Sequence, residues 1–285
     1  MCAVPATITT SSQVLWFEDA AAGDPGRVGG KAAALASLAT DHPVPPGFVV
    51  TDGVPEADIE AAYEELASRA GTPEPVVAVR SSATDEDGLE ASFAGQHETV
   101  LGVQGIDAVL EALEACRASG RAPRALAYRR ANGLQAPTTD LPVLVQLLVP
   151  ADAAAVVFSV NPVSPYAGEV LVNAALGLGE SIVGGTVTPD EWAIARPSLD
   201  VRRRTIADKR RMTVRTPGGS REVDVPVPLR RLPSLDDAQA REAAALALRL
   251  ECDLGVPVDL ELAWSAGELH LLQCRPITTL TQEAA

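Results

Sequence analysis

The feature that most restricts the fold of this chain is a pair of alternating segments near its carboxyl end. Residues 258–264 and 268–275 each alternate apolar and polar side chains, and Ser265-Ala266-Gly267 separates them. A period of two is typical of strands that bury one face, and a short gap containing glycine joins antiparallel neighbours. The chain is therefore expected to close with a β-hairpin, so its fold must contain an antiparallel sheet.

The polar positions of this hairpin carry groups that can bind a metal ion and phosphate. If the turn centres on Gly267, Glu261 lies opposite Gln273. Asp259 then lies opposite Arg275. A carboxylate beside an amide oxygen suits Mg²⁺ that also binds nucleotide phosphates, and a guanidinium neutralises phosphate charge. An ordinary cross-strand ladder of polar side chains explains the same spacing.

The segments before the hairpin show no repeated strand–helix–strand order. Strands are expected at 14–17, 48–50, 76–79 and 169–174, and helices at 32–38, 58–70 and 235–254, the last with Ser234 as its N-cap. Residues 143–149 and 154–160 are expected as two strands joined by a turn, and residues 199–227 as an edge hairpin. This mixture predicts the α+β class with largely antiparallel strands.

Composition excludes several classes of protein. The 285 residues are 47% hydrophobic, which is enough for one large domain or two lobes with a buried core. The net charge of −15 disfavours general binding to nucleic acid or anionic lipid. The arginine runs at 202–204 and 209–211 lack interleaved aromatic residues, so a solvated hairpin explains them better than a nucleic-acid site.

The expected location is the cytoplasm. The four cysteines are far apart and form no metal-binding or disulfide pattern, which suits a reducing compartment. The amino-terminal residues lack the pattern of a signal peptide, and no apolar run approaches the length of a membrane span. A soluble protein without membrane contacts is therefore predicted.

Two basic residues are placed where a phosphate could bind. Lys31 follows Gly29-Gly30 at the start of a predicted helix, and a helix start favours an anion. The spacing is not that of a P-loop, because Pro25 and Ala32 occupy positions that require glycine and Ser/Thr. Arg80 directly follows a buried strand and precedes acidic residues, so it binds either a phosphate or a carboxylate.

Several stretches along residues 15–280 together form a specific combination. They are Val28-Gly29-Gly30-Lys31-Ala32, Val44-Pro45-Pro46-Gly47-Phe48, residues 79–87 and 91–99, Val145-Gln146, Gly177-Leu178-Gly179-Glu180, Asp259-Leu260-Glu261 and residues 272–277. Their content and order resemble the amino-terminal ATP-binding domain shared by phosphoenolpyruvate synthase, pyruvate phosphate dikinase and rifampin phosphotransferase.

This resemblance implies an ATP-grasp-like fold in which two lobes, residues 1–147 and 148–285, clamp ATP and Mg²⁺. It implies that Lys31 and Arg80 contact ATP phosphates and that Gly95 and Thr99 belong to a phosphate loop. Gln146 is expected near adenine. The implied metal ligands are Glu261 and Gln273, and Arg275 is expected to stabilise the transferring phosphoryl group.

The resemblance also implies a function, a Mg²⁺–ATP-dependent phosphotransferase, or kinase, of the phosphoenolpyruvate synthase type. Members of the family pass a phosphoryl group to a histidine on a separate domain, and this chain ends near Thr278-Thr279, where the ATP-binding domain would end. The acceptor is therefore either a small molecule or a histidine on a separately encoded partner protein. Two alternatives are an ATP-grasp ligase that forms an acyl phosphate and a non-catalytic nucleotide-binding subunit.

Overall fold

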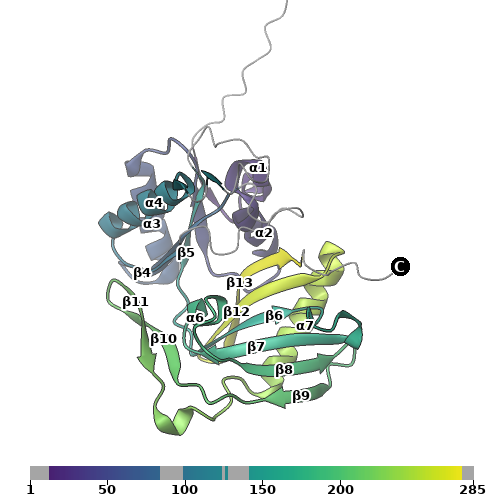
Figure 1. The fold of residues 1–285 in the computed structure, drawn as a ribbon. Helices are drawn as coiled ribbons and strands as arrows, with labels where there is room; N and C mark the ends of the chain where they lie inside the picture. The colour runs from purple at the N-terminus through teal and green to yellow at the C-terminus, as the bar shows by residue number, and fades with distance from the viewer. Residues whose placement is uncertain (1–12, 84–98, 124–125, 128–140, 278–285) are drawn as a thin grey trace, which may run out of the picture.

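The computed structural model describes residues 13–83, 99–123, 126–127 and 141–277, which form two antiparallel β-sheets with helices packed against them (Figure 1). The first sheet lies in the amino-terminal part of the chain, and the second lies in the carboxy-terminal part. This architecture confirms the α+β class and the two lobes with antiparallel sheets that the sequence predicts.

The first sheet is buried on both faces. Its strand order is β1 (Val14–Trp16), β2 (Gly47–Val50), β5 (Val143–Leu147), β3 (Val77–Ser81) and β4 (Thr99–Val103). Phe48 and Val50 pack with α3 (Glu56–Ala70) and α4 (Ile106–Gly120), whereas Val49 packs on the opposite side with α1 (Pro25–Val28) and α2 (Gly30–Leu38). Alternate residues of β2 thus enter two different cores, which explains why this strand is continuously apolar.

The second sheet has one long helix on one face, and its other face turns toward the first sheet (Figure 1). Its strand order is β13 (Glu268–Pro276), β12 (Val258–Ser265), β6 (Ala153–Phe158), β7 (Glu169–Leu176), β8 (Asp190–Ala195) and β9 (Val201–Thr205). Helix α7 (Asp237–Leu254) buries a stripe of small residues, among them Ala240, Ala243 and Ala247, against this sheet. Small side chains let the helix approach the strands closely.

A separate hairpin touches both halves of the molecule. Strands β10 (Arg211–Thr216) and β11 (Gly219–Asp224) pair only with each other in the sheets of the described chain. A Cβ atom on Gly102 of β4 would lie 2.4 Å from the carbonyl oxygen of Gly219. On the other side, the backbone N–H of Leu178 donates to the carbonyl of Thr213 at 2.8 Å. The β10–β11 hairpin therefore contacts β4 and the glycine segment before the short helix α6 (Glu180–Val183).

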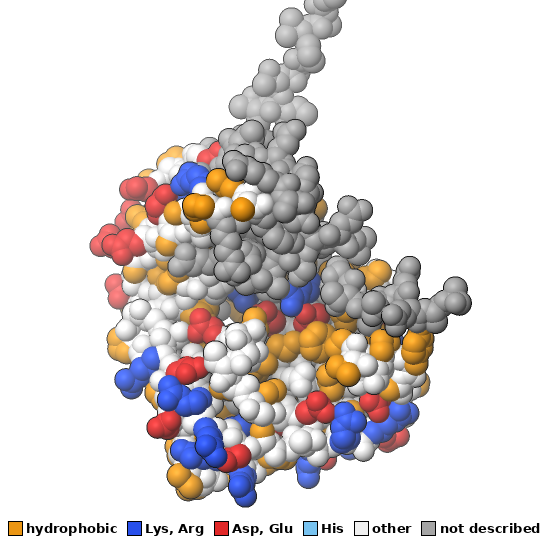
Figure 2. All heavy atoms as spheres, in the orientation of Figure 1, with side chains coloured by type: hydrophobic (Ala, Val, Ile, Leu, Met, Phe, Trp, Pro, Cys, Tyr) orange, Lys and Arg blue, Asp and Glu red, His pale blue; other side chains and the backbone are white. Residues whose placement is uncertain are grey.

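Short 3₁₀ helices complete the described structure at Ala20–Gly23, Pro165–Ala167 and Val227–Leu229. Among the described residues, no helix combines the length and apolar composition that crossing a membrane requires. Figure 2 shows basic side chains gathered over the region of β9 and the β10–β11 hairpin. Several of these arginines pair with acidic neighbours, as in Arg203–Glu191 at 2.8 Å and Arg211–Glu222 at 3.2 Å.

Two expectations about local structure are wrong. The segments at 143–149 and 154–160 do not pair with each other, because β5 is a central strand of the first sheet and β6 belongs to the second. Ser234 is not the N-cap of the long helix. Asp236 is the N-cap, and its carboxylate accepts hydrogen bonds from the backbone N–H groups of Ala238 and Gln239, each at 2.8 Å.

The start of α2 depends on a glycine that closely approaches the end of β3. Gly29 has φ +80°, and a Cβ atom there would lie 1.9 Å from the carbonyl oxygen of Ser82. The Ser82 hydroxyl accepts a hydrogen bond from the backbone N–H of Ala32 at 3.0 Å. The glycine therefore lets the first turn of α2, which carries Lys31, lie against the strand end that follows Arg80.

We expect Gly29→Ala to lower the free energy of unfolding by at least about 2 kcal/mol, because the backbone strain and the overlap add. Gly71→Ala is the matched control. Gly71 has φ +67° but nothing within 4 Å of its added Cβ, so only the strain of about 1 kcal/mol applies. Denaturant unfolding of both variants measures the difference. Equal losses would contradict a role for the close approach.

Candidate functional site

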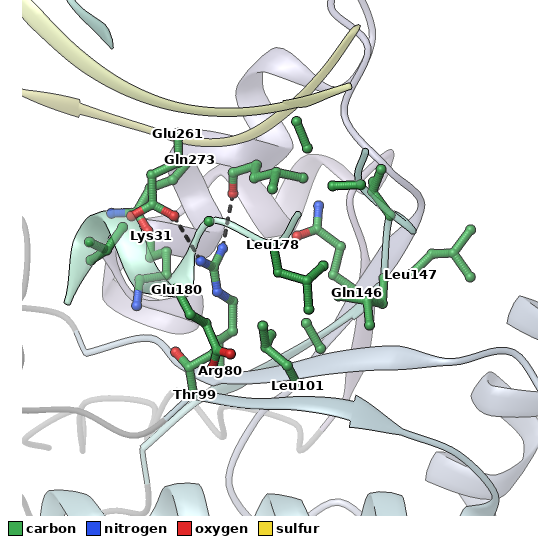
Figure 3. A pocket seen from close by; sticks show the side chains of 18 of the residues that line it. Lys31, Arg80, Thr99, Leu101, Gln146, Leu147, Leu178, Glu180, Glu261 and Gln273 are labelled. Atoms are coloured by element: carbon green, nitrogen blue, oxygen red, sulfur yellow. Dashed lines mark hydrogen bonds and ion pairs between the residues drawn. The ribbon is translucent and has the colours of Figure 1, made fainter. Parts of the chain in front are cut away.

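A pocket of about 550 Å³ lies between the facing sides of the two sheets. The first sheet and α2 contribute one wall, and β12, β13 and the α6 segment contribute the other (Figures 1 and 3). Of the eight site residues predicted from the sequence, seven line it: Lys31, Arg80, Thr99, Gln146, Glu261, Gln273 and Arg275. The eighth, Gly95, lies outside the described residues.

Arg80 connects the two walls of the pocket. Its Nη2 lies 3.0 Å from Oε2 of Glu261, and its Nη1 donates to the carbonyl oxygen of Leu272 at 3.1 Å (Figure 3). The side chains of Arg80 and Glu261 are only 13% and 17% exposed, so water screens this ion pair little. The Nε of Arg80 is buried and has no hydrogen-bond partner among the described residues. Arg80 is therefore fixed in place by two groups of the opposite sheet.

Alternation along β3 explains the direction of Arg80. Val77 and Val79 are buried in the core beneath α3 and α4, so Ala78 and Arg80 face the other side and line the pocket. The sequence places Arg80 just after the strand, whereas the structure includes it in β3. Its partner in the structure is a carboxylate of the opposite sheet.

The carbonyl that binds Arg80 comes from a β-bulge. Glu261 pairs with Gln273, and the next residue, Leu262, pairs with Leu271, so Leu272 has no partner on β12. Bulges often occur beside active sites, where they redirect backbone or side-chain groups. Here the bulge turns the carbonyl of Leu272 toward the first sheet.

The register predicted for the closing hairpin is confirmed. Glu261 lies opposite Gln273, and Asp259 lies opposite Arg275. The turn itself differs slightly, because Ala266 and Gly267 both have positive φ and the turn centres between them.

Glu261 and Gln273 are adjacent across the two strands and face the pocket (Figure 3). Gln273 is only 6% exposed, which is unusual for an amide side chain. An amide oxygen and a carboxylate at one edge of a pocket form a donor set of the kind that Mg²⁺ prefers. The arrangement therefore fits the metal site that the sequence predicts, and the assignment of these two ligands stays a prediction.

Asp259 orients Arg275. Its Oδ2 lies 2.8 Å from Nε and 2.7 Å from Nη2 of Arg275, a geometry that fixes the plane of the guanidinium. Burial raises the pKa of Asp259 above its ordinary value of 3.8, and the positive charge of Arg275 opposes that rise. Arg275 lines the pocket, so Asp259 supports a site residue from behind.

Lys31 lies in the first turn of α2 and is 7% exposed. Its Nζ donates to the carbonyl oxygen of Ser81 at 3.2 Å, which places the ammonium beside the end of β3. In Figure 3 the side chains of Lys31, Glu261 and Gln273 lie at the same end of the pocket. This end therefore combines the ammonium group of Lys31 with carboxylate and amide side chains.

The opposite end of the pocket is mostly apolar. Gln146 of β5 is 2% exposed, and its Nε2 donates to the carbonyl oxygen of Pro45 at 3.1 Å. Leu147, Leu148 and Val149 follow it along the wall. Apolar surfaces with a few fixed polar groups are typical of sites that hold a flat organic ring.

Sequence reasoning gave no role to several residues that line the pocket. Leu101, Leu178 and Glu180 are three of them. Leu178 and Glu180 belong to the glycine-rich stretch 177–180. That stretch is part of the family resemblance, but the sequence assigned no role to its side chains. Leu101 lies two positions after Thr99 on β4 and shares its face, so the period of that strand could have indicated it.

Comparison with known proteins agrees with this geometry. The family model described as "Pyruvate phosphate dikinase, AMP/ATP-binding domain" matches residues 54–285. The chain belongs to this family. The resemblance stated from the sequence is therefore confirmed, and the pocket lies within a domain whose family description names AMP and ATP. Six of the seven described site residues fall inside the matched range, and Lys31 precedes it.

Among the relatives of this ATP-binding domain, phosphoenolpyruvate synthase of Pyrococcus furiosus is 41% identical over 236 residues, which is 80% of this chain and 29% of that protein. Rifampicin phosphotransferase of Streptomyces sviceus is 39% identical over 223 residues, or 78% of this chain and 26% of that protein. This chain thus spans less than a third of the length of either relative. A solved structure of a dinucleotide-forming acetyl-coenzyme A synthetase from Ca. Korarchaeum cryptofilum is 11% identical, with a TM-score of 0.44 over 87% of this chain and 91% of that one.

Proposed function

We propose that this domain binds Mg²⁺–ATP in the pocket between the sheets and transfers a phosphoryl group from ATP to an acceptor. The observation that carries the proposal is the meeting of Lys31, Arg80 and Arg275 with Glu261 and Gln273 in the lining of a single pocket. Membership of an AMP/ATP-binding family supports it, as do relatives named synthase and phosphotransferase.

The pocket is suited to hold ATP in one direction. The apolar end beside Gln146 would take the adenine ring, and the cationic end would take the phosphates. We place the boundary between the two lobes at residues 147 and 148, so the adenine end lies where the chain passes from one lobe to the other. Lys31 and Arg80 would contact phosphate oxygens, since both line the pocket.

Glu261 and Gln273 would hold the metal ion. A bound Mg²⁺ supplies partial neutralisation of the phosphate charge. Arg275, held by Asp259, would stabilise the negative charge on the phosphoryl group during transfer. Transfer of this kind depends mainly on positioning and charge stabilisation, which agrees with a site built of fixed cations rather than a nucleophilic side chain.

The acceptor is proposed to be a small molecule or a histidine on a separately encoded partner protein. We place this reaction in the cytoplasm, where ATP is available. Among the described residues, Cys116, Cys252 and Cys274 form no disulfide, which agrees with a reducing compartment.

Calorimetry with ATP and Mg²⁺ tests the binding site. Lys31→Ala and Glu261→Ala are each expected to weaken ATP binding by roughly 10-fold or more, because each loses a charged contact worth about 1.5–3 kcal/mol. Glu222→Ala, on the exposed edge of the β10–β11 hairpin, is the matched control and should bind ATP like the unaltered chain. Unchanged affinity in both pocket variants would refute the site. Analysis of the nucleotide product then separates release of ADP from release of AMP and phosphate.

A further inference from the structure

Glu261 and Arg80 form an ion pair with each other, although the proposed function gives each of them a different partner. Nη2 of Arg80 lies 3.0 Å from Oε2 of Glu261 (Figure 3). Under the proposed function Arg80 contacts phosphate, whereas Glu261 holds Mg²⁺. Phosphate competes with a carboxylate for a guanidinium, and a metal ion competes with a guanidinium for a carboxylate. The ion pair and the two ligand contacts are therefore linked.

The surroundings of the ion pair make this competition strong. Both side chains are largely buried, with 13% of Arg80 and 17% of Glu261 exposed, so water screens their charges little. A phosphate group that reaches Arg80 also comes close to the carboxylate of Glu261, and the two negative groups repel each other. A nucleotide without a metal ion therefore meets a cation whose charge is cancelled and an anion beside it.

The two proposed metal ligands differ in this respect. Gln273 lies opposite Glu261 and lines the same pocket, but its amide carries no charge. It offers an oxygen to a metal ion without cancelling the charge of Arg80. Glu261 is thus the ligand whose binding to Mg²⁺ changes what Arg80 can do.

A second contact keeps Arg80 in place when its charged partner changes. Nη1 of Arg80 donates to the carbonyl oxygen of Leu272 at 3.1 Å. Because a carbonyl group is neutral, this hydrogen bond positions the guanidinium without cancelling its charge. The ion pair with Glu261 can therefore be exchanged for a phosphate contact while Arg80 stays at the same point of the pocket.

We infer that Glu261 makes the phosphate site dependent on the metal ion. Paired with Arg80, Glu261 disfavours a nucleotide without Mg²⁺; bound to Mg²⁺, it leaves the charge of Arg80 to the phosphates. Glu261 is then a selectivity residue as well as a metal ligand. This inference rests on the proposed function and adds a penalty against metal-free nucleotide, whereas an ordinary metal ligand has no effect on the binding of ATP without a metal.

Calorimetry of Glu261→Gln with ATP tests the inference, once in excess Mg²⁺ and once in excess EDTA. Glutamine keeps the size of the side chain and removes its charge. With Mg²⁺ the variant should bind ATP roughly 10-fold more weakly than the unaltered chain, because one charged contact is lost. In EDTA it should bind ATP roughly 10-fold more tightly, because Arg80 is no longer neutralised. Glu261→Ala should show the same two opposite changes.

Two further variants serve as controls. Glu222→Gln makes the same change in net charge outside the pocket lining and should alter neither affinity. In an Arg80→Met chain, Glu261→Gln relieves only the direct repulsion between carboxylate and phosphate. The gain in metal-free affinity should there fall from about 10-fold to about 2-fold or less. Circular dichroism verifies that each variant is folded.

Two results would overturn the inference. One is an affinity for metal-free ATP that is unchanged or lower in Glu261→Gln, which would leave Glu261 as an ordinary metal ligand and the proposed function intact. The other is an equal gain in the chains with and without Arg80, which would assign the effect to direct repulsion. Failure of the unaltered chain to bind ATP in Mg²⁺ would instead refute the proposed function, and the inference with it.

Discussion

Replacing Asp190 by alanine is expected to lower the free energy of unfolding by about 3–5 kcal/mol. Asp190 and Lys209 are 0% and 1% exposed, and Nζ of Lys209 lies 2.7 Å from Oδ1 of Asp190. The same carboxylate accepts hydrogen bonds from the backbone N–H of Ala207 at 2.8 Å and from both the N–H and the hydroxyl of Ser234 at 2.7 and 2.8 Å. Its removal leaves a buried ammonium group without its counter-charge.

Denaturant unfolding measures this loss. Asp208→Ala is the matched control, because Asp208 pairs with Arg210 at the exposed surface and should contribute less than about 1 kcal/mol. The double variant Asp190→Ala/Lys209→Met should recover part of the stability, because it removes the unpaired charge as well. A loss below about 1 kcal/mol for Asp190→Ala would show that the pair does not hold this region together.

Replacing Arg80 by methionine is expected to reduce phosphoryl transfer from ATP by at least about 100-fold. The variant removes the guanidinium proposed to face the phosphates, and loss of one fixed donor to developing charge typically costs 10²–10³ in rate. It also leaves Glu261 without the ion pair that now holds it at 3.0 Å. Arg80→Lys should recover little activity, because one ammonium group does not reproduce the planar fork that binds Glu261 and the Leu272 carbonyl together.

Turnover of ATP with an identified acceptor measures this effect. Arg204→Met is the control, because Arg204 forms an ion pair with Asp237 on the exposed edge of the second sheet, away from the pocket lining. Circular dichroism and denaturant unfolding verify that Arg80→Met remains folded. Activity of Arg80→Met within about 3-fold of the unaltered chain would exclude Arg80 from the reaction.

The closing hairpin was predictable from local sequence. Strict alternation over 258–264 and 268–275 and the turn at residues 265–267 led to the pairing of Glu261 with Gln273. The bulge at Leu272 was not predictable, because nothing in the side chains around it distinguishes a bulged residue from a paired one. The carbonyl that binds Arg80 was missed for the same reason.

Contacts between the two sheets could not be predicted from local sequence patterns. Arg80 and Glu261 are 181 positions apart, and no periodicity relates one strand to another at that distance. The prediction that Lys31, Arg80 and Glu261 belong to one site came from the family resemblance. The strands at 143–149 and 154–160 were wrongly expected to be neighbours because a short gap between apolar runs is typical of a hairpin. Burial of Val143 and Leu144 on opposite faces of the first sheet is what overrides that local preference.

The bulge at Leu272 also bears on how this hairpin tolerates change in length. From the turn at Ala266 and Gly267, a regular ladder pairs each residue of β13 with one of β12 as far as Leu271 with Leu262. If Leu272 were absent, Gln273 would follow Leu271 directly and still reach Glu261 in an uninterrupted ladder. Leu272 is thus a surplus residue for the hairpin. Its contribution is the carbonyl oxygen that accepts a hydrogen bond from Arg80 of the neighbouring lobe. Deleting Leu272 would therefore preserve the strand register but remove a hydrogen bond between the two sheets.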